Sequence, residues 1–118
     1  MNILFEIKQL FESLQIPIET GVFSKEAPNE YIVLVPLADS YPLNASDMPQ
    51  VDRQEVRITI FTKNNYIKLK NRICGLLLNH YFYITDRRYN GYDTDVGYHQ
   101  YTIDVAKIYE IDIENEEE

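Results

Sequence analysis

The chain has 118 residues, ten of them tyrosine and none tryptophan, and a formal net charge of −8. This length holds one domain with a single core and is too short for two. No apolar run approaches the roughly 20 residues that span a bilayer, and the N-terminus lacks the basic region of a signal peptide. Cys74 is the single cysteine, so no disulfide within the chain is expected and a reducing compartment fits.

The acidic residues are unevenly placed. Six of the 19 acids lie in residues 110–118, which hold no base, and the preceding residues carry 11 bases against 13 acids. We therefore predict one domain over residues 1–112 and an acidic, mobile tail over residues 113–118. The alternative is a tail that docks on a basic partner or repels nucleic acid. The overall acidity argues against tight binding to a phosphate backbone.

The first part of the chain predicts a helix followed by strands. Apolar residues from Ile3 to Leu14 recur at helical spacing, and the helix should end before Pro17. Residues 18–23 read as a short strand or an extended link. The continuous apolar run within residues 30–37 predicts a strand buried on both faces, with Pro36 at its end or at a sheet edge, because proline lacks an amide donor.

Residues 38–53 are predicted to form one long irregular loop. Pro42 and Pro49 stand among Asp, Asn and Ser residues that favour turns. Irregular loops beyond about 12–15 residues are usually functional or disordered. One interpretation is a mobile connection between strands. The one we prefer is a loop that becomes ordered against a partner, because it keeps four apolar residues, namely Tyr41, Leu43, Met48 and Val51.

Residues 54–80 predict a strand that runs directly into a helix. Val56, Ile58 and Ile60 alternate with polar residues, and apolar residues recur at helical spacing from Tyr66 onward. The asparagines at positions 64 and 65 are expected to cap the helix. Within it, Cys74 is expected to be a small core residue. Gly75 costs up to about 1 kcal/mol relative to alanine, which suggests a close helix–sheet contact there.

The last third predicts two strands and a turn. A short aromatic strand is expected over residues 81–85, a hairpin turn at Asn90-Gly91, and a final strand over residues 98–112. Its alternation changes phase at Ala106-Lys107, where a bulge or a strand end is expected. The order of elements predicts an α+β fold, with a mostly antiparallel β-sheet covered by two α-helices and a long inter-strand loop.

Motifs for catalysis are not found in the sequence. It contains no phosphate loop, dinucleotide turn or nucleophile elbow, and His80 and His99 have no ligand-like spacing to each other or to Cys74. Asp93 and Asp95 resemble a cation loop only faintly, because the remaining ligands are missing. We predict no enzyme activity, no catalytic residue, no metal and no cofactor.

A group of tyrosines surrounds the second hairpin together with Arg87 and Arg88. Its members are Tyr81, Tyr83, Tyr89, Tyr92, Tyr98 and Tyr101. Three interpretations stay open: a protein interface, in which Tyr and Arg are enriched, ordinary strand propensity, and a stacking platform for single-stranded nucleic acid. We prefer the interface and place nucleic acid last, because acidic residues flank the two arginines.

The order of these motifs resembles the tail-completion proteins of tailed bacteriophages and prophages, the tail-terminator and head–tail joining proteins. The strand-to-helix unit over residues 57–77 carries the resemblance. Further matching motifs are Glu30-Tyr31-Ile32-Val33 before the long loop, Phe61-Thr62-Lys63 at the end of the central strand, and Gly97-Tyr98-His99-Gln100 leading into the last strand. The order of elements, from the N-terminal helix to the last strand, extends the match over most of residues 1–112.

The resemblance implies a structural virion protein that forms a ring, often hexameric, which terminates the tail tube and joins it to the head connector. Its expected partners are copies of itself, the tail tube protein and head connector proteins, with DNA passing through without specific binding. The expected location is the virion and, during assembly, the host bacterial cytoplasm, with no membrane association. The alternative is a cytosolic adaptor or a single-stranded nucleic-acid-binding module that uses the hairpin.

On this interpretation, the long loop and the hairpin make the contacts with neighbouring subunits or partners. The expected interface residues are Tyr41, Leu43, Met48, Asp52, Arg53, Arg87, Arg88, Tyr89 and Tyr92.

Overall fold

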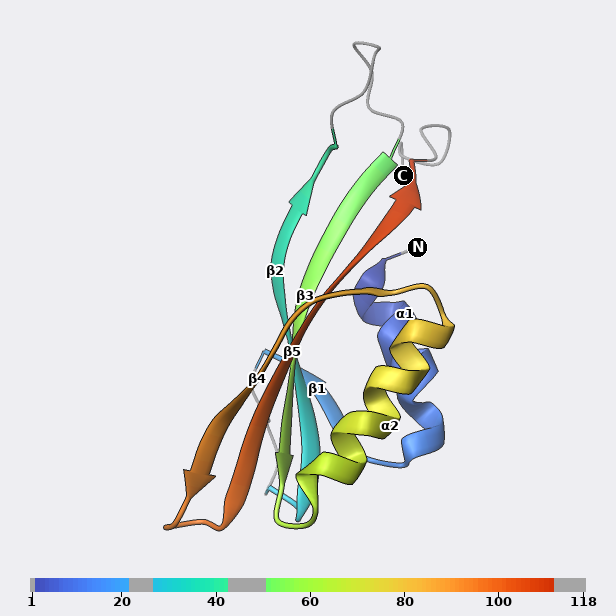
Figure 1. The fold of residues 1–118 in the computed structure, drawn as a ribbon. Helices are drawn as coiled ribbons and strands as arrows, with labels where there is room; N and C mark the ends of the chain where they lie inside the picture. The colour runs from blue at the N-terminus through green and yellow to red at the C-terminus, as the bar shows by residue number, and fades with distance from the viewer. Residues whose placement is uncertain (1, 22–26, 43–50, 112–118) are drawn as a thin grey trace.

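The computed structural model describes residues 2–21, 27–42 and 51–111, which form a five-stranded sheet with two α-helices on one of its faces (Figure 1). The elements in chain order are α1 (Ile3–Leu10), the 3₁₀ turn η1 (Phe11–Leu14), β1 (Ile18–Thr20), β2 (Glu30–Ser40), β3 (Val51–Thr62), α2 (Tyr66–Asn79), β4 (Tyr83–Asp93) and β5 (Tyr98–Glu110). The acidic tail predicted for residues 113–118 lies outside the described residues.

The strand order is β1-β2-β3-β5-β4. β1 runs parallel to β2 over three residues, and the other three pairings are antiparallel. The predicted combination of two helices with a largely antiparallel sheet is therefore present, but the sheet is mixed. The parallel pairing was not predicted, because β1 is too short to show a pattern in the sequence.

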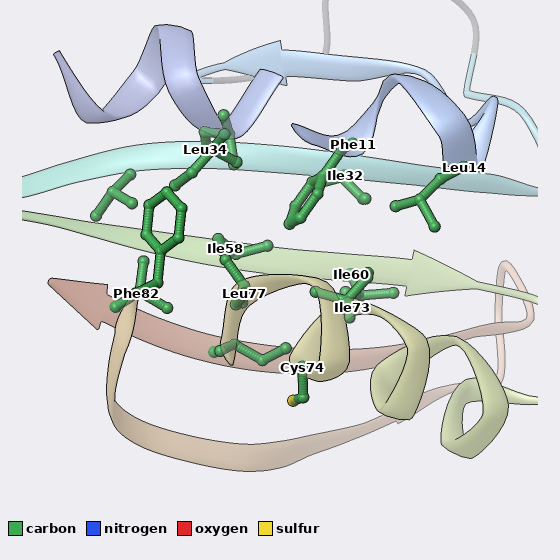
Figure 2. Close-up of a cluster of buried hydrophobic side chains, with 14 of the residues drawn as sticks. Phe11, Leu14, Ile32, Leu34, Ile58, Ile60, Ile73, Cys74, Leu77 and Phe82 are labelled. Carbon is green, nitrogen blue, oxygen red and sulfur yellow. The ribbon is translucent and has the colours of Figure 1, made fainter. Parts of the chain in front are cut away.

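Both helices bury their apolar stripes against the same face of the sheet. Asn2 begins α1, because its side chain accepts a hydrogen bond from the Phe5 amide at 2.9 Å. The helix tightens into η1 and ends before Pro17, as predicted. Figure 2 shows the core between helices and sheet, which includes Phe11, Leu14, Ile32, Leu34, Ile58, Ile60, Ile73, Cys74, Leu77 and Phe82.

The strand-to-helix unit is confirmed, with Asn65 alone of the two expected asparagines capping the helix through its side chain. Val56, Ile58 and Ile60 are fully buried, and the Asn65 side chain accepts hydrogen bonds from the amides of Ile67 and Lys68. Cys74 is buried, as expected. The expectation for Gly75 is wrong, because a Cβ added there would meet no atom within 4 Å. No close helix–sheet contact requires glycine at that position.

β2 is buried on both faces at its centre, as predicted, but it continues past Pro36 to Ser40. Because β1 pairs with β2 only as far as Leu34, no described strand pairs with the outer side of β2 beyond that residue. Pro36 therefore occupies an edge position, where its missing amide costs no ladder hydrogen bond.

The predicted irregular loop over residues 38–53 is wrong at both ends. Residues 38–40 pair with residues 53–55 of β3, and β3 pairs with β5 as far as Val51. These three strands extend past the helices (Figure 1), and we call this extension the arm. Ladder pairing from two sides outweighs the weak strand propensity of the polar residues. Residues 43–50, with Leu43 and Met48, lie outside the described residues.

The predicted turn at Asn90-Gly91 is also wrong. Both residues lie inside β4, at a register shift between Tyr89 and Gly91, and Gly91 has a φ of +126°. The chain turns at residues 94–97, where the Asp93 side chain accepts a hydrogen bond from the Asp95 amide at 2.9 Å and Gly97 has a φ of +81°. Glycine at positive φ occurs in some bulges as well as in hairpin turns, and here Gly91 lies at a bulge.

The short strand predicted over residues 81–85 is wrong in length, because β4 begins at Tyr83 and continues to Asp93. The last strand, predicted to reach residue 112, ends at Glu110. The bulge or strand end expected at Ala106-Lys107 is not found, because β5 pairs with β3 without a register shift from His99 to Glu110. The alternation of apolar residues in the sequence changes phase where β4 stops pairing with β5, at Ala106. β5 itself continues without a break.

Candidate interaction surfaces

The structure describes seven of the nine predicted interface residues, all but Leu43 and Met48, and it does not bring these seven together. Tyr41 directly follows β2 and is 64% exposed. Arg53 pairs with Ile108 in the arm, whereas Tyr92 pairs with His99 near the β4–β5 turn. Nine residues of β5 separate these two positions, a distance of about 30 Å. The long-loop residues and the hairpin residues therefore belong to two separate surfaces.

Asp52 and Arg53 are strand residues that already have partners. The Gln54 side-chain amide donates to the Asp52 carboxylate at 2.9 Å, on the side of the sheet that carries the helices. Arg53 forms an ion pair with Glu55 on the opposite side, which we call the open face. Successive strand residues point to opposite faces, so these two side chains do not serve one contact.

Two predicted tyrosines do meet, around His99. The Tyr89 hydroxyl lies 2.9 Å from His99 Nδ1, and the Tyr92 ring centroid lies 4.7 Å from that of His99. Tyr66 of α2 completes the group, with its ring 4.7 Å from that of Tyr89. We call Tyr66, Tyr89, Tyr92 and His99 the tyrosine cluster. Tyr89 and Tyr92 are 43% and 52% exposed, so the cluster presents aromatic surface to solvent.

Arg87 and Arg88 point to opposite faces of β4. Arg87 Nη1 lies 3.9 Å from Cys74 Sγ of α2, and Arg88 Nη2 lies 3.4 Å from Asp86 Oδ2. Both arginines are exposed. Because they do not share a face, they do not combine into the basic groove that a single-stranded nucleic acid needs beside its stacking platform.

An aromatic groove of about 440 Å³ lies on the open face. Tyr31 and Phe61 stack at 4.6 Å between ring centroids, and Tyr98 packs edge-on to Tyr31 at 5.5 Å. Burial, and to a lesser extent Tyr98, raises the pKa of Tyr31. Among the described residues that line the groove, Asp93 is the sole carboxylate, so they supply no pair of groups for general acid–base chemistry.

A second hollow, of about 310 Å³, lies where β4 begins, beside the arm. We call it the notch. Its lining comprises Arg53, Tyr81, Tyr83, Ala106, Lys107 and Ile108. Tyr81, Tyr83 and Ile108 are 88%, 64% and 56% exposed, which is unusual for large apolar side chains so close together. The sequence analysis grouped the two tyrosines with the hairpin and did not single out Ile108. The alternation of Ile108 with Lys107 along the last strand was the pattern that could have revealed it.

Two partly buried polar contacts lie beside these surfaces. On the helix side, the Tyr109 hydroxyl donates to Glu6 Oε1 at 2.9 Å, and Lys107 Nζ donates to Glu6 Oε2. Burial, together with the hydrogen bond and charge of Glu6, raises the pKa of Tyr109. Lys107 Nζ also donates to the His80 carbonyl at 2.9 Å, which ties the chain after α2 to β5 next to the notch.

The described residues contain no group of three His, Cys, Asp or Glu side chains placed to hold a metal ion. Within the same part of the chain, no helix has the length and apolar character needed to cross a membrane. No protein-family model matches the sequence, and no curated protein is significantly similar to it.

Proposed function

We propose that this protein is a structural, non-enzymatic subunit whose copies associate side by side into a ring. The observation that carries the proposal is where its exposed apolar side chains lie. Of the eleven exposed large apolar residues in the described part of the chain, six lie in β2 or β4 or within two residues of their ends: Leu37, Tyr41, Tyr81, Tyr83, Tyr89 and Tyr92.

The same two strands have unpaired backbone edges. No described strand pairs with the outer side of β4 along its 11 residues, or with β2 beyond Leu34. Such edges are templates for pairing with another chain unless they are blunted. Pro36 and the register shift that follows it blunt part of the β2 edge, so the stretch of β2 that remains for pairing is residues 38–40. β4 carries Arg87 and Arg88 together with Asp86 and Asp93 and has no net charge, whereas β2 carries Glu30 and Asp39, so pairing the two edges brings no like net charges together.

Pairing between two different edges has a consequence for symmetry. β2 and β4 lie toward opposite sides of the sheet, so a contact between one copy's β2 and its neighbour's β4 is head-to-tail. A head-to-tail contact builds a ring when its rotation closes and a filament when it does not. The ring that we propose is the closed form of such a contact.

The biological role that we assign to the ring is tail completion in a tailed phage or prophage. The ring terminates the tail tube and joins it to the head connector, within the virion and earlier in the cytoplasm of the bacterial host. The support is the resemblance in the order of motifs, above all the unit of β3 and α2. The net charge of −8 suits a channel through which DNA slides without sticking.

The test is the mass measured by light scattering after size exclusion, over a concentration series, alone and with assembled tail tubes. We expect a fixed multiple of 13.9 kDa and rings at tube ends in electron micrographs. Leu37→Glu in β2 and Tyr89→Glu in β4 should each lower the mass. Leu78→Glu is the control, because Leu78 is 59% exposed but lies on α2.

A folded protein that stays monomeric both alone and with tail tubes would contradict the proposal. Saturable binding of short single-stranded DNA by that monomer, lost in Tyr89→Ala, would support the nucleic-acid alternative instead. Circular dichroism of each variant separates loss of assembly from loss of fold.

A further inference from the structure

The outer edge of β5 is incompletely covered. β3 pairs with β5 as far as Glu110, but β4 pairs with it only as far as Ala106. Within the described residues, no strand lies beside Lys107, Ile108, Tyr109 and Glu110 on the side away from β3. The notch opens at this edge, between the start of β4 and the arm. The space is in line with β4, where one more short strand would extend the sheet.

Tyr81, at the rim of the notch, has an unusual backbone conformation. It directly follows the last turn of α2, with a φ of 66°. The Phe82 amide donates to the Leu77 carbonyl at 3.0 Å and the Tyr81 amide to the Leu78 carbonyl at 3.3 Å, which is the hydrogen-bond pattern of a Schellman cap. Glycine is the usual residue at this left-handed position, because it has no Cβ to clash.

The tyrosine at this position gains little from its own subunit. Its side chain is 88% exposed, so the strain is not offset by burial within the described structure. An exposed aromatic residue held in a strained conformation beside two other exposed apolar residues is typical of a contact with another molecule.

The edge also has an alternating chemical character. Lys107 points to the helix side, where its Nζ donates to Glu6 and to the His80 carbonyl. Ile108 points to the open face, next to Tyr83. A strand added beside this edge would place alternate residues on the two faces. It would fit best with apolar residues beside Ile108 and polar residues on the helix side, where Lys107 already pairs with Glu6.

We propose that the notch binds residues 111–114 of a second copy of this chain as an added strand. That segment reads Ile-Asp-Ile-Glu, which is the alternation the edge requires. Ile111 and Ile113 then contact Tyr81, Tyr83 and Ile108, while the acids lie near Lys107. If each subunit inserts this segment into the notch of the next, the contact links neighbouring subunits around a ring. This part of the inference rests on the proposed function.

The segment must come from another copy. Residues 111–114 directly follow β5, and a chain that folds back beside its own β5 spends at least two residues on the turn. A turn at residues 112–113 would place residues 114–117 beside the edge. Those residues read Glu-Asn-Glu-Glu and bring no apolar side chain to the notch.

The experiment uses a fluorescein-labelled peptide of residues 110–118 and measures its anisotropy as protein is added. The protein is the full chain carrying Ile111→Asp and Ile113→Asp, so its own tail does not compete while the notch stays intact. We expect saturable binding in buffer of physiological ionic strength, where salt screens the repulsion between the acidic peptide and the acidic protein. The same peptide with both isoleucines changed to aspartate should not bind.

Two variants of that protein test the notch itself. Ile108→Asp and Tyr81→Gly should each weaken peptide binding by about tenfold or more, as loss of a buried anchor does at an interface. Tyr81→Gly should at the same time raise the melting temperature, because glycine fits the left-handed position, so its effect on binding cannot be attributed to unfolding. Leu78→Asp is the matched control and should leave binding unchanged.

Absence of saturable binding, or binding that neither notch variant weakens, would overturn the inference. The light-scattering mass separates this failure from that of the proposed function. If the Ile111→Asp, Ile113→Asp chain still forms a ring but does not bind the peptide, the strand exchange is refuted and the proposed ring stands. If the peptide binds but the chain never assembles, the notch stands as a binding site and the proposed ring is refuted.

Discussion

Arg57 and Asp104 face each other across β3 and β5 and form a two-point ion pair, with Nε–Oδ1 at 2.9 Å and Nη2–Oδ2 at 3.0 Å. The pair lies on the open face, where no described helix covers it, yet Asp104 is only 7% exposed. The hydrogen bond and the charge of Asp104 raise the pKa of Arg57. The pair joins the two central strands of the sheet.

We expect this pair to contribute more to stability than an exposed ion pair does. A double-mutant cycle with Arg57→Ala and Asp104→Ala, followed by urea unfolding, should give a coupling free energy above the roughly 0.2–1 kcal/mol of exposed pairs. The exposed pair of Arg88 and Asp86, whose N–O distance is 3.4 Å, is the control. Equal coupling in the two cycles would contradict the expectation.

The contact between Tyr109 and Glu6 predicts a loss of stability in alkaline solution. Burial and Glu6 raise the pKa of Tyr109 above its ordinary value of 10.0, so the folded state disfavours the tyrosinate. The stabilisation is complete below pH 10 and is lost as the pH rises above it, because only the unfolded chain then releases the proton.

Tyr109→Phe isolates this effect. It should reduce the free energy of unfolding by about 1–3 kcal/mol at neutral pH, since it removes a hydrogen bond to a carboxylate. Above pH 10 the difference between the two proteins should shrink, because only the natural chain has this group to titrate. Urea unfolding over the pH range measures the free energy of unfolding of both proteins. Groups that titrate in both proteins contribute equally, so their effect cancels in the difference. A difference independent of pH would count against the mechanism.

Two glycines should respond to alanine in opposite directions. Gly75 lies in α2, and a Cβ there meets nothing within 4 Å, so Gly75→Ala should stabilise the protein by up to about 1 kcal/mol through helix propensity. Gly91 has a φ of +126° at the β4 bulge, so Gly91→Ala should destabilise it, although the space is equally open. Thermal unfolding of both variants checks the contrast, and the same sign in both would refute it.

The N-terminus of α2 offers a matched pair of asparagines. The Asn65 side chain caps two amides, at 3.0 and 3.3 Å, so Asn65→Ala should cost about 1 kcal/mol. Asn64→Ala is the control, because the bond from the Asn64 amide to Thr62 Oγ1 uses the backbone and survives the substitution. Urea midpoints compare the two, and a cost for Asn64→Ala equal to that for Asn65→Ala would show that capping is not the cause.

Local sequence patterns were sufficient to predict the structure wherever a single periodicity of apolar residues determined it. The alternation of Val56, Ile58 and Ile60, the cap at Asn65 and the buried Cys74 could all be read from neighbouring residues, because burial on one face imposes its period on the sequence. The edge position of Pro36 followed from the missing amide alone. Of the expected interface residues, Tyr89 and Tyr92 lie close together on one strand, and the contact expected of them stays a prediction.

What the sequence could not decide depended on partners far away along the chain. Asn90-Gly91 favours positive φ in a turn and in a bulge alike, and only the register with β5 determines which one forms. The arm is ordered because β3 is paired on both sides, which no local signal in its polar residues reveals. The notch joins Arg53, Tyr81 and Ile108 from separate segments, so it exists only once the end of β4 pairing leaves the edge of β5 uncovered.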